Sequence, residues 1–147
     1  MAIHTILVAF DFSEPSSRAL ERAHQLCQAT GAALQLVHVH PELYDGRGNP
    51  ELGLPWPSQG QKERYLRFLE QEIAAQLDRQ LGPAAAATKI HVAHGDPVKR
   101  VLEYATEVGA DMLCVGSTGK GAVQRVLLGS ISQSILRGSL VPVLVVH

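Results

Sequence analysis

The sequence predicts an α/β fold, built as a single open five-stranded parallel sheet with helices on both faces. Five short apolar segments alternate with segments in which apolar residues recur at helical spacing. The apolar segments are hydrophobic along their whole length, as expected for parallel strands covered on both faces. A chain of 147 residues has the size of one domain, so we predict a single domain over residues 1–147.

The first half of the chain predicts two strands and two helices. Residues 6–10 are a compact apolar run that predicts the first strand, and residues 33–39 predict the second. Between them, Ser13 supplies a helix cap and Gly31 a helix stop. The second helix is expected over residues 61–81, where apolar residues again recur at helical spacing.

A long connection over residues 41–60 separates the second strand from the second helix. It is rich in Pro and Gly and contains Trp56, the only tryptophan of the chain. Loops of this length are often lids or partner surfaces, or else disordered. Trp56 either packs over the mouth of a pocket or seals the loop onto the body, and the sequence leaves both readings open.

The second half continues the alternation. The remaining strands are expected over residues 89–93, 112–115 and 141–146. Asp96 caps a helix that Gly109 ends. A last helix follows Ser130, which together with Gln133 fits the pattern of a capping box.

A glycine-rich segment joins the fourth strand to this last helix. Gly116 and Gly119 follow the strand, and Gly129 and Ser130 come after nine intervening residues. A strand, a glycine loop and a helix N-terminus in this order expose backbone N–H groups that can hold a phosphate. Gly116 can turn the chain off the strand, and Gly119 can let a ligand approach the backbone. Ordinary turn glycines and a helix cap are the alternative.

Two common phosphate-binding loops do not fit this segment. A P-loop requires a hydroxyl residue directly after its lysine, but Gly121 follows Lys120. A dinucleotide-binding fingerprint belongs at the first strand, and this segment lies late in the chain. The predicted phosphate site is therefore of another kind.

Asp11 directly follows the first predicted strand. In open parallel sheets, ligands bind at the carboxyl ends of the strands, where the winding direction reverses. If the first and fourth strands are neighbours, Asp11 and the glycine segment face one crevice. A turn or cap carboxylate is the alternative reading of Asp11.

Composition excludes several classes of protein. The formal net charge is −1 and the basic residues are scattered, so the sequence shows no basic patch of the kind that binds nucleic acid. No apolar run approaches the roughly 18 residues of a membrane span, and the N-terminus does not resemble a signal peptide. Cys27 and Cys114 lie in apolar settings that suggest reduced thiols. We therefore predict a cytoplasmic protein.

The histidines do not predict a metal site. His38 and His40 alternate on the second strand, and His91 and His94 lie on or beside the third. A metal site needs at least a third converging ligand, so structural or solvated roles are favoured. His40, at the end of the second strand, is the histidine that we expect to border the cleft.

These motifs together resemble the universal stress protein family, in particular its ATP-binding members. The pattern G-x2-G-x9-G-[ST] of that family is matched by Gly116, Gly119, Gly129 and Ser130 at every spacing. The other matching segments are residues 6–13, 36–39, 95–97 and 142–146, so the resemblance covers almost the whole chain.

The resemblance implies the strand order 3-2-1-4-5 and an adenine nucleotide between the first and fourth strands. The implied ligand-binding residues are Ala9, Phe10, Asp11, Val39, Val115, Gly116, Thr118, Gly119, Gly129, Ser130, Ile131 and Ser132. The resemblance implies ATP with Mg²⁺ or Mn²⁺, an ion held mainly through the phosphates, with Asp11 as a candidate ligand. Phe10 departs from the smaller residue that is usual there and could narrow the adenine side.

The resemblance also implies a regulator or sensor in the stress response, with slow or absent hydrolysis of ATP. No carboxylate and base stand at a spacing that would activate water. Two alternatives stay open: a slow ATPase or an enzyme that transfers phosphate or nucleotidyl groups, and a dimeric interaction module with no nucleotide requirement. The apolar strand Val141 to Val146 would need protection at a sheet edge, which suggests a homodimer. A regulatory protein partner is expected but not identified.

Overall fold

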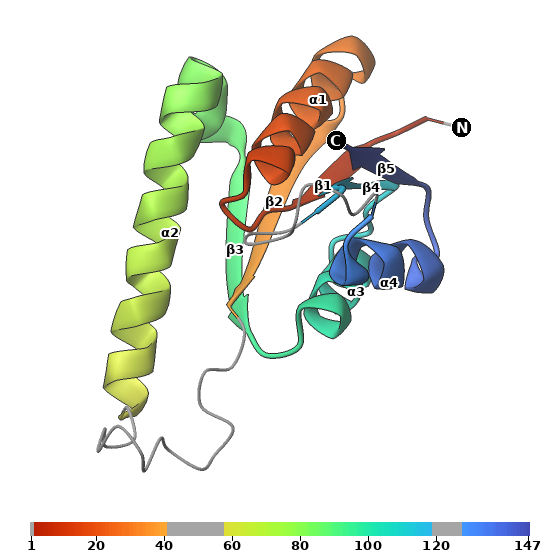
Figure 1. The fold of residues 1–147 in the computed structure, drawn as a ribbon. Coiled ribbons are helices and arrows are strands. Elements are labelled where there is room, and N and C mark those ends of the chain that lie inside the picture. Colours follow the sequence, from red (N-terminus) through yellow and green to blue (C-terminus); the bar gives the residue numbers. More distant parts are fainter. Residues whose placement is uncertain (1, 41–57, 119–127) are drawn as a thin grey trace.

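The computed structural model describes residues 2–40, 58–118 and 128–147, which form a five-stranded parallel sheet (Figure 1). The strands are β1 (Thr5–Ala9), β2 (Ala33–His40), β3 (Lys89–His94), β4 (Met112–Gly116) and β5 (Val143–Val146). The helices are α1 (Glu14–Thr30), α2 (Gln59–Leu81), α3 (Pro97–Glu107) and α4 (Ser130–Gly138), with a 3₁₀ helix η2 (Gly82–Ala87) after α2. The strand order is β3-β2-β1-β4-β5, and all four pairings are parallel. The predicted fold class and strand order are confirmed.

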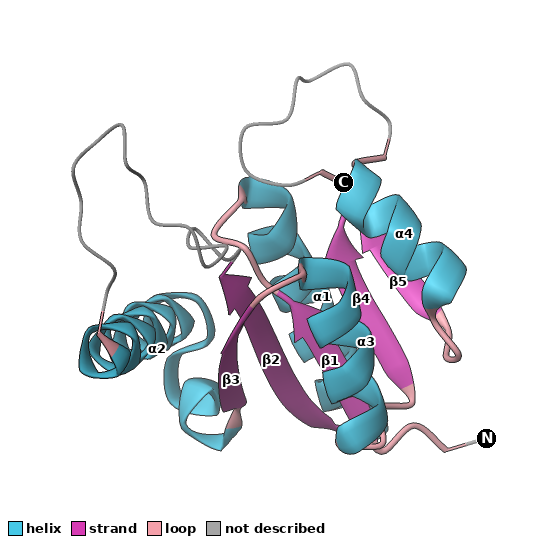
Figure 2. Ribbon diagram, turned by 90° about the horizontal axis from the view of Figure 1, so that it is seen from below, coloured by secondary structure: helices cyan, strands magenta, loops and turns pink. Residues whose placement is uncertain are grey.

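The helices cover both faces of the sheet, and Figure 2 shows α3 and α4 in front of it with α1 behind. Successive residues of a strand point to opposite faces, and β1 follows this rule. Ile6 and Val8 pack with residues of α1 and α2, whereas Leu7 packs with residues of α3 and α4. The sheet therefore has two hydrophobic cores, one on each side. None of the helices in the described ranges is long and apolar enough to cross a membrane.

The N-termini of the helices differ in how they are capped. A side chain accepts a hydrogen bond from a backbone N–H at the start of three helices: Ser13 caps α1, Ser58 caps α2 and Asp96 caps α3. For α4, whose N-cap is Gly129, no capping side chain is found among residues 2–40, 58–118 and 128–147. The predicted capping box at Ser130 is therefore wrong: Ser130 is already the first helical residue, because the extended backbone of Gly129 (φ −67°, ψ 157°) makes the entry into the helix.

The strands β1 to β4 begin and end within one residue of the prediction, and three other boundaries differ more. The helix α2 begins at Gln59, and η2 continues the chain where Gly82 was expected to end the helical structure. The strand β5 begins two residues later than predicted, because the Ser139 side chain bonds both the N–H and the carbonyl of Val141. Most of the 41–60 connection, including Trp56, lies outside the described residues.

Asp111 ties the start of β4 to the start of β1. Its Oδ2 accepts the backbone N–H of His4 at 2.8 Å and that of Thr5 at 2.9 Å. These two hydrogen bonds favour the ionised carboxylate and lower the pKa of Asp111. The neighbouring strands β1 and β4 are thus held in register at the edge of the sheet opposite to the strand C-termini, where the candidate site lies.

Candidate functional site

A cavity of about 630 Å³ lies at the carboxyl ends of the strands. Its walls come from the ends of β1, β2 and β4, from α2, and from the N-terminal turns of α1, α3 and α4. The predicted site residues within the described ranges all line it: Ala9, Phe10, Asp11, Val39, Val115, Gly116, Thr118, Gly129, Ser130, Ile131 and Ser132. Gly119 lies outside the described residues. Residues from both halves of the sequence therefore meet at one place.

The N-terminus of α4 opens onto this cavity. Its first residues, Ser130 and Ile131, are among the lining residues. The N–H groups of the first turn of a helix have no acceptor within the helix, and no side chain in the part of the chain that the structure describes caps α4. The aligned peptide dipoles add a partial positive charge at this end. The arrangement suits an anionic group such as a phosphate.

Backbone hydrogen bonds hold this helix terminus against the sheet. The Gly129 N–H donates to the Ser117 carbonyl at 2.6 Å, and the Ser117 N–H donates to the Val146 carbonyl at 2.7 Å. The buried Ser132 hydroxyl donates to the Gly116 carbonyl at 2.7 Å. Because this bond occupies the Ser132 hydroxyl, its main role is to anchor α4 to the end of β4.

Gly116 has a different role from the predicted one. It does not turn the chain off the strand, because it is the last residue of β4 and pairs with Val146. A Cβ atom at Gly116 would lie 2.7 Å from the Ser16 nitrogen and 2.8 Å from the Pro15 carbonyl carbon. Gly116 therefore lets the first turn of α1 approach the end of β4.

The turn after β1 holds Asp11 at the cavity. Its Oδ1 accepts the Ser13 N–H at 2.9 Å, and its own N–H donates to the Ser16 hydroxyl at 3.3 Å. The next residue, Phe12, has a φ of 64°, a conformation that residues with side chains rarely adopt. Asp11 is therefore a turn carboxylate and a cavity residue at the same time.

Phe10 does not project into the cavity as a separate wall. Its side chain is only 2% exposed and belongs to the core on the α1 side. Its ring packs edge to face against Phe12, and Phe12 packs in the same way against His38, with both pairs of ring centroids 5.1 Å apart. The Nδ1 of His38 donates to the Phe10 carbonyl at 2.7 Å, since a carbonyl can only accept. These aromatic side chains thus pack against one another as one part of the cavity wall.

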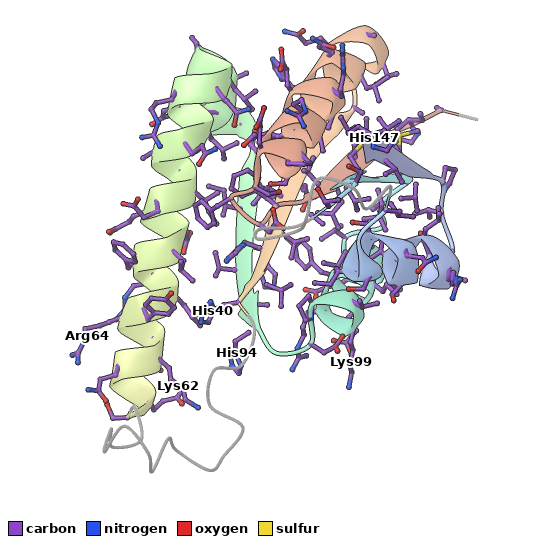
Figure 3. All side chains as sticks on the ribbon, in the orientation of Figure 1. His40, Lys62, Arg64, His94, Lys99 and His147 are labelled. Atoms are coloured by element: carbon purple, nitrogen blue, oxygen red, sulfur yellow. The ribbon has the colours of Figure 1, made fainter. Side chains whose placement is uncertain are left out.

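His40 borders the cavity, as expected, and Figure 3 shows it between the end of β2 and α2. Its partner there is Tyr65 of α2. The ring centroids of His40 and Tyr65 lie 4.9 Å apart at an interplanar angle of 68°. Burial lowers the pKa of His40, and the neighbouring His38 and His94 lower it further. The lowered pKa favours the neutral form of the His40 ring.

Several cavity residues were missed by the sequence reasoning. They are Phe12, Ser16, Val37, Tyr65, Leu69, Pro97, Val101 and Ile135, and His38 had been given only a structural or solvated role. The spacing of Tyr65 and Leu69 places both on one face of α2, and the sequence carries this signal. It carries no signal that this face meets the end of β2, because the two are joined through the 41–60 connection.

Comparison with known proteins relates the chain to one family. The profile of the universal stress protein family matches residues 2–147. The universal stress protein YxiE of Bacillus subtilis is 31% identical over 151 residues, and the alignment covers 97% of each chain. UspA from Lactobacillus plantarum shares the fold with a TM-score of 0.79 at 20% identity, covering 100% of this chain and 99% of that one. A universal stress protein in complex with cAMP has a TM-score of 0.64 and 29% identity, covering 100% of this chain and 98% of its own.

Proposed function

Because the chain belongs to the universal stress protein family, we propose that it binds an adenine nucleotide and acts as a nucleotide-dependent regulator in the stress response. The observation that carries the proposal is the uncapped N-terminus of α4, which opens onto the same cavity as Asp11 and the ends of β1 and β2. The similar structure in complex with cAMP supports an adenine nucleotide as the ligand. We take ATP as the preferred one.

In this proposal the two ends of the cavity bind different parts of the nucleotide. The N–H groups of Ser130 and Ile131 hold phosphate oxygens, while Gly129 lines the site with its own N–H bonded to the Ser117 carbonyl. Val39 and Ala9 line the side where the base lies. Asp11 is placed to accept a ribose hydroxyl or to contact a cation.

A divalent ion, Mg²⁺ or Mn²⁺, fits this site only as a companion of the phosphates. Within the described ranges, no three His, Cys, Asp or Glu side chains converge so that they could hold a metal. Asp11 is the carboxylate that lines the described part of the cavity. Such an ion would therefore take most of its ligands from phosphate oxygens and water, the arrangement that Mg²⁺ commonly adopts.

The arrangement around Asp11 favours binding over turnover. One of its oxygens, Oδ1, already accepts the Ser13 N–H, so that oxygen is committed to the turn. The alternative, a slow ATPase or a transferase, is distinguished by timed release of ADP. Turnover on the order of 1 s⁻¹ would make the protein an enzyme.

We further propose a homodimer that pairs the β5 edges of two chains. The strand Val143–Val146 is apolar and only partly covered, and it lies at the edge of the sheet. An edge of this kind invites pairing with another strand. Sedimentation velocity would test the proposal, and a monomer at micromolar concentration would contradict it.

The experiment that tests nucleotide binding uses two variants of Ser130. Proline is tolerated at the first helical position, where Pro97 already stands in α3. The extended backbone of Gly129 is compatible with a following proline. Ser130→Pro therefore removes one N–H from the phosphate site without breaking α4, and Ser130→Ala removes only the hydroxyl.

We expect calorimetry with ATP and Mg²⁺ to show binding to the wild-type protein. A hydrogen bond to a charged group contributes roughly 1.5–3 kcal/mol, so Ser130→Pro should weaken binding by about tenfold or more. Ser130→Ala should have a smaller effect. No heat of binding with ATP, AMP or cAMP, together with no nucleotide released by heating the purified protein, would refute the proposed function.

A further inference from the structure

The wall of the cavity farthest from α4 is aromatic. It is formed by His40, the last residue of β2, and by Tyr65 and Leu69, which lie four residues apart and so on one face of α2. Tyr65 is 43% exposed, although it sits beside the ring of His40. Within the described ranges, its ring contacts are this one with His40 and its stacking on Phe68.

The strand order sets the distance between this wall and the N-terminus of α4. The helix α4 is anchored to the end of β4, and β1 lies between β4 and β2. Two strand spacings amount to about 10 Å. A nucleotide carries its base one sugar away from its phosphates, so a ligand with phosphates at α4 places its base toward the end of β2.

The chemistry of the two ends agrees with this orientation. The α4 end offers backbone N–H groups, which suit an anion. The β2 end offers a phenol ring and an imidazole whose pKa is lowered by burial. Aromatic side chains pack with their π faces or edges against nucleobases, and this packing does not depend on which hydrogen-bonding groups the base carries.

We propose that Tyr65, positioned by its edge-to-face contact with His40, packs against the base of the bound nucleotide and makes affinity depend on an aromatic base. The inference rests on the proposed function, because it assigns residues to the base end of the same site. It adds α2 to the elements that contact the ligand. It also gives the exposed Tyr65 ring a role.

The test compares three variants of α2 by calorimetry with ATP and Mg²⁺. Tyr65→Leu removes the ring, and Tyr65→Phe keeps it while removing the hydroxyl. Phe68→Leu is the matched control, because Phe68 is a neighbouring ring of the same helix, is 52% exposed, and does not line the cavity. We expect Tyr65→Leu to weaken ATP binding about tenfold, which corresponds to about 1.4 kcal/mol. Tyr65→Phe and Phe68→Leu should stay within about twofold of the wild type.

Tripolyphosphate, which has no base, serves as the second probe. We expect Tyr65→Leu to leave its affinity unchanged, because the phosphates bind at α4. Wild-type binding of ATP with an unchanged affinity in Tyr65→Leu would overturn this inference while leaving the proposed function in place. An equal loss for ATP and tripolyphosphate would also overturn it, since it would indicate a general change in the cavity. No ATP binding by the wild type would overturn both.

Discussion

Replacing Gly116 with alanine tests whether its role is steric. Gly116 is not among the glycines with a positive φ, so alanine is compatible with its backbone conformation. The added Cβ would, however, lie 2.7 Å from the Ser16 nitrogen and 2.8 Å from the Pro15 carbonyl carbon. Both are backbone atoms of the first turn of α1, and neither can move aside by a rotation of a side chain. The substitution must therefore displace α1 or the end of β4.

The cost can be estimated from two opposing effects. Overpacking of a well-packed interior costs roughly 1–3 kcal/mol. Alanine recovers about 0.5–1 kcal/mol of backbone entropy relative to glycine. We therefore expect Gly116→Ala to lower the free energy of unfolding by about 1–2 kcal/mol. For a chain of this size that corresponds to a fall in Tm of about 2–8 °C.

The same substitution elsewhere provides the controls. At Gly60 in α2 the nearest atom to a new Cβ is the Ser58 Oγ at 4.0 Å, so Gly60→Ala should raise stability by about 0.5 kcal/mol. At Gly138 the new Cβ would meet the Leu102 Cδ1 at 2.8 Å, which is the end of a flexible side chain. The change in the free energy of unfolding for Gly138→Ala should therefore lie between those for Gly60→Ala and Gly116→Ala. Urea unfolding followed by circular dichroism measures all three. A Gly116→Ala protein as stable as the wild type would refute the steric role.

Three further predictions concern stability and reactivity. Hydrogen bonds from two backbone N–H groups lower the pKa of Asp111. The contribution of Asp111 to the free energy of unfolding is therefore fully present above its ordinary pKa of 3.8 and is lost as the pH falls through the lowered pKa. The difference in stability between the wild type and Asp111→Asn should close over that range, and a difference independent of pH would contradict this. Burial raises the pKa of Cys114 to about 12 and also raises that of Cys27, so a thiol reagent at pH 8 should label neither until the protein unfolds, and rapid labelling of the native protein would show the burial to be wrong. Ser132→Ala leaves the Gly116 carbonyl without its 2.7 Å donor, which should cost about 1–3 kcal/mol in urea unfolding; a loss under about 0.5 kcal/mol would indicate that water replaces the hydroxyl.

The local elements of the fold could be predicted because their signals are local. Uninterrupted apolar runs identified the buried strands, and Ser13 and Asp96 cap helices as their patterns indicate. The order of the strands was not available from these patterns. It came from the resemblance, since the pairing of β1 with β4 joins residues more than 100 positions apart and leaves no mark on either segment.

The part of the site that depends on the spacing of glycines could be predicted from the sequence. The part that depends on tertiary contacts could not. Gly129 and Ser130 are placed correctly at the entrance of α4, but the capping-box pattern of Ser130 and Gln133 assigns the cap to Ser130 instead of Gly129. Gly116 was expected to turn the chain, whereas its small size matters for the approach of α1. That reason depends on a helix about 100 residues earlier in the sequence and could not be derived from the segment itself.

The cavity residues differ in what they contribute, and this decides which variants can test function. Gly116 and Ser132 hold α1 and α4 against the end of β4, so their substitution changes the fold and the cavity together. Ser130 and Tyr65 line the cavity without any side-chain hydrogen bond in the described part of the chain. Variants of these two residues can therefore lower affinity while leaving the free energy of unfolding nearly unchanged. The opposite result, a loss of stability as large as the loss of binding energy, would mean that the uncapped α4 and the exposed ring serve folding rather than a ligand.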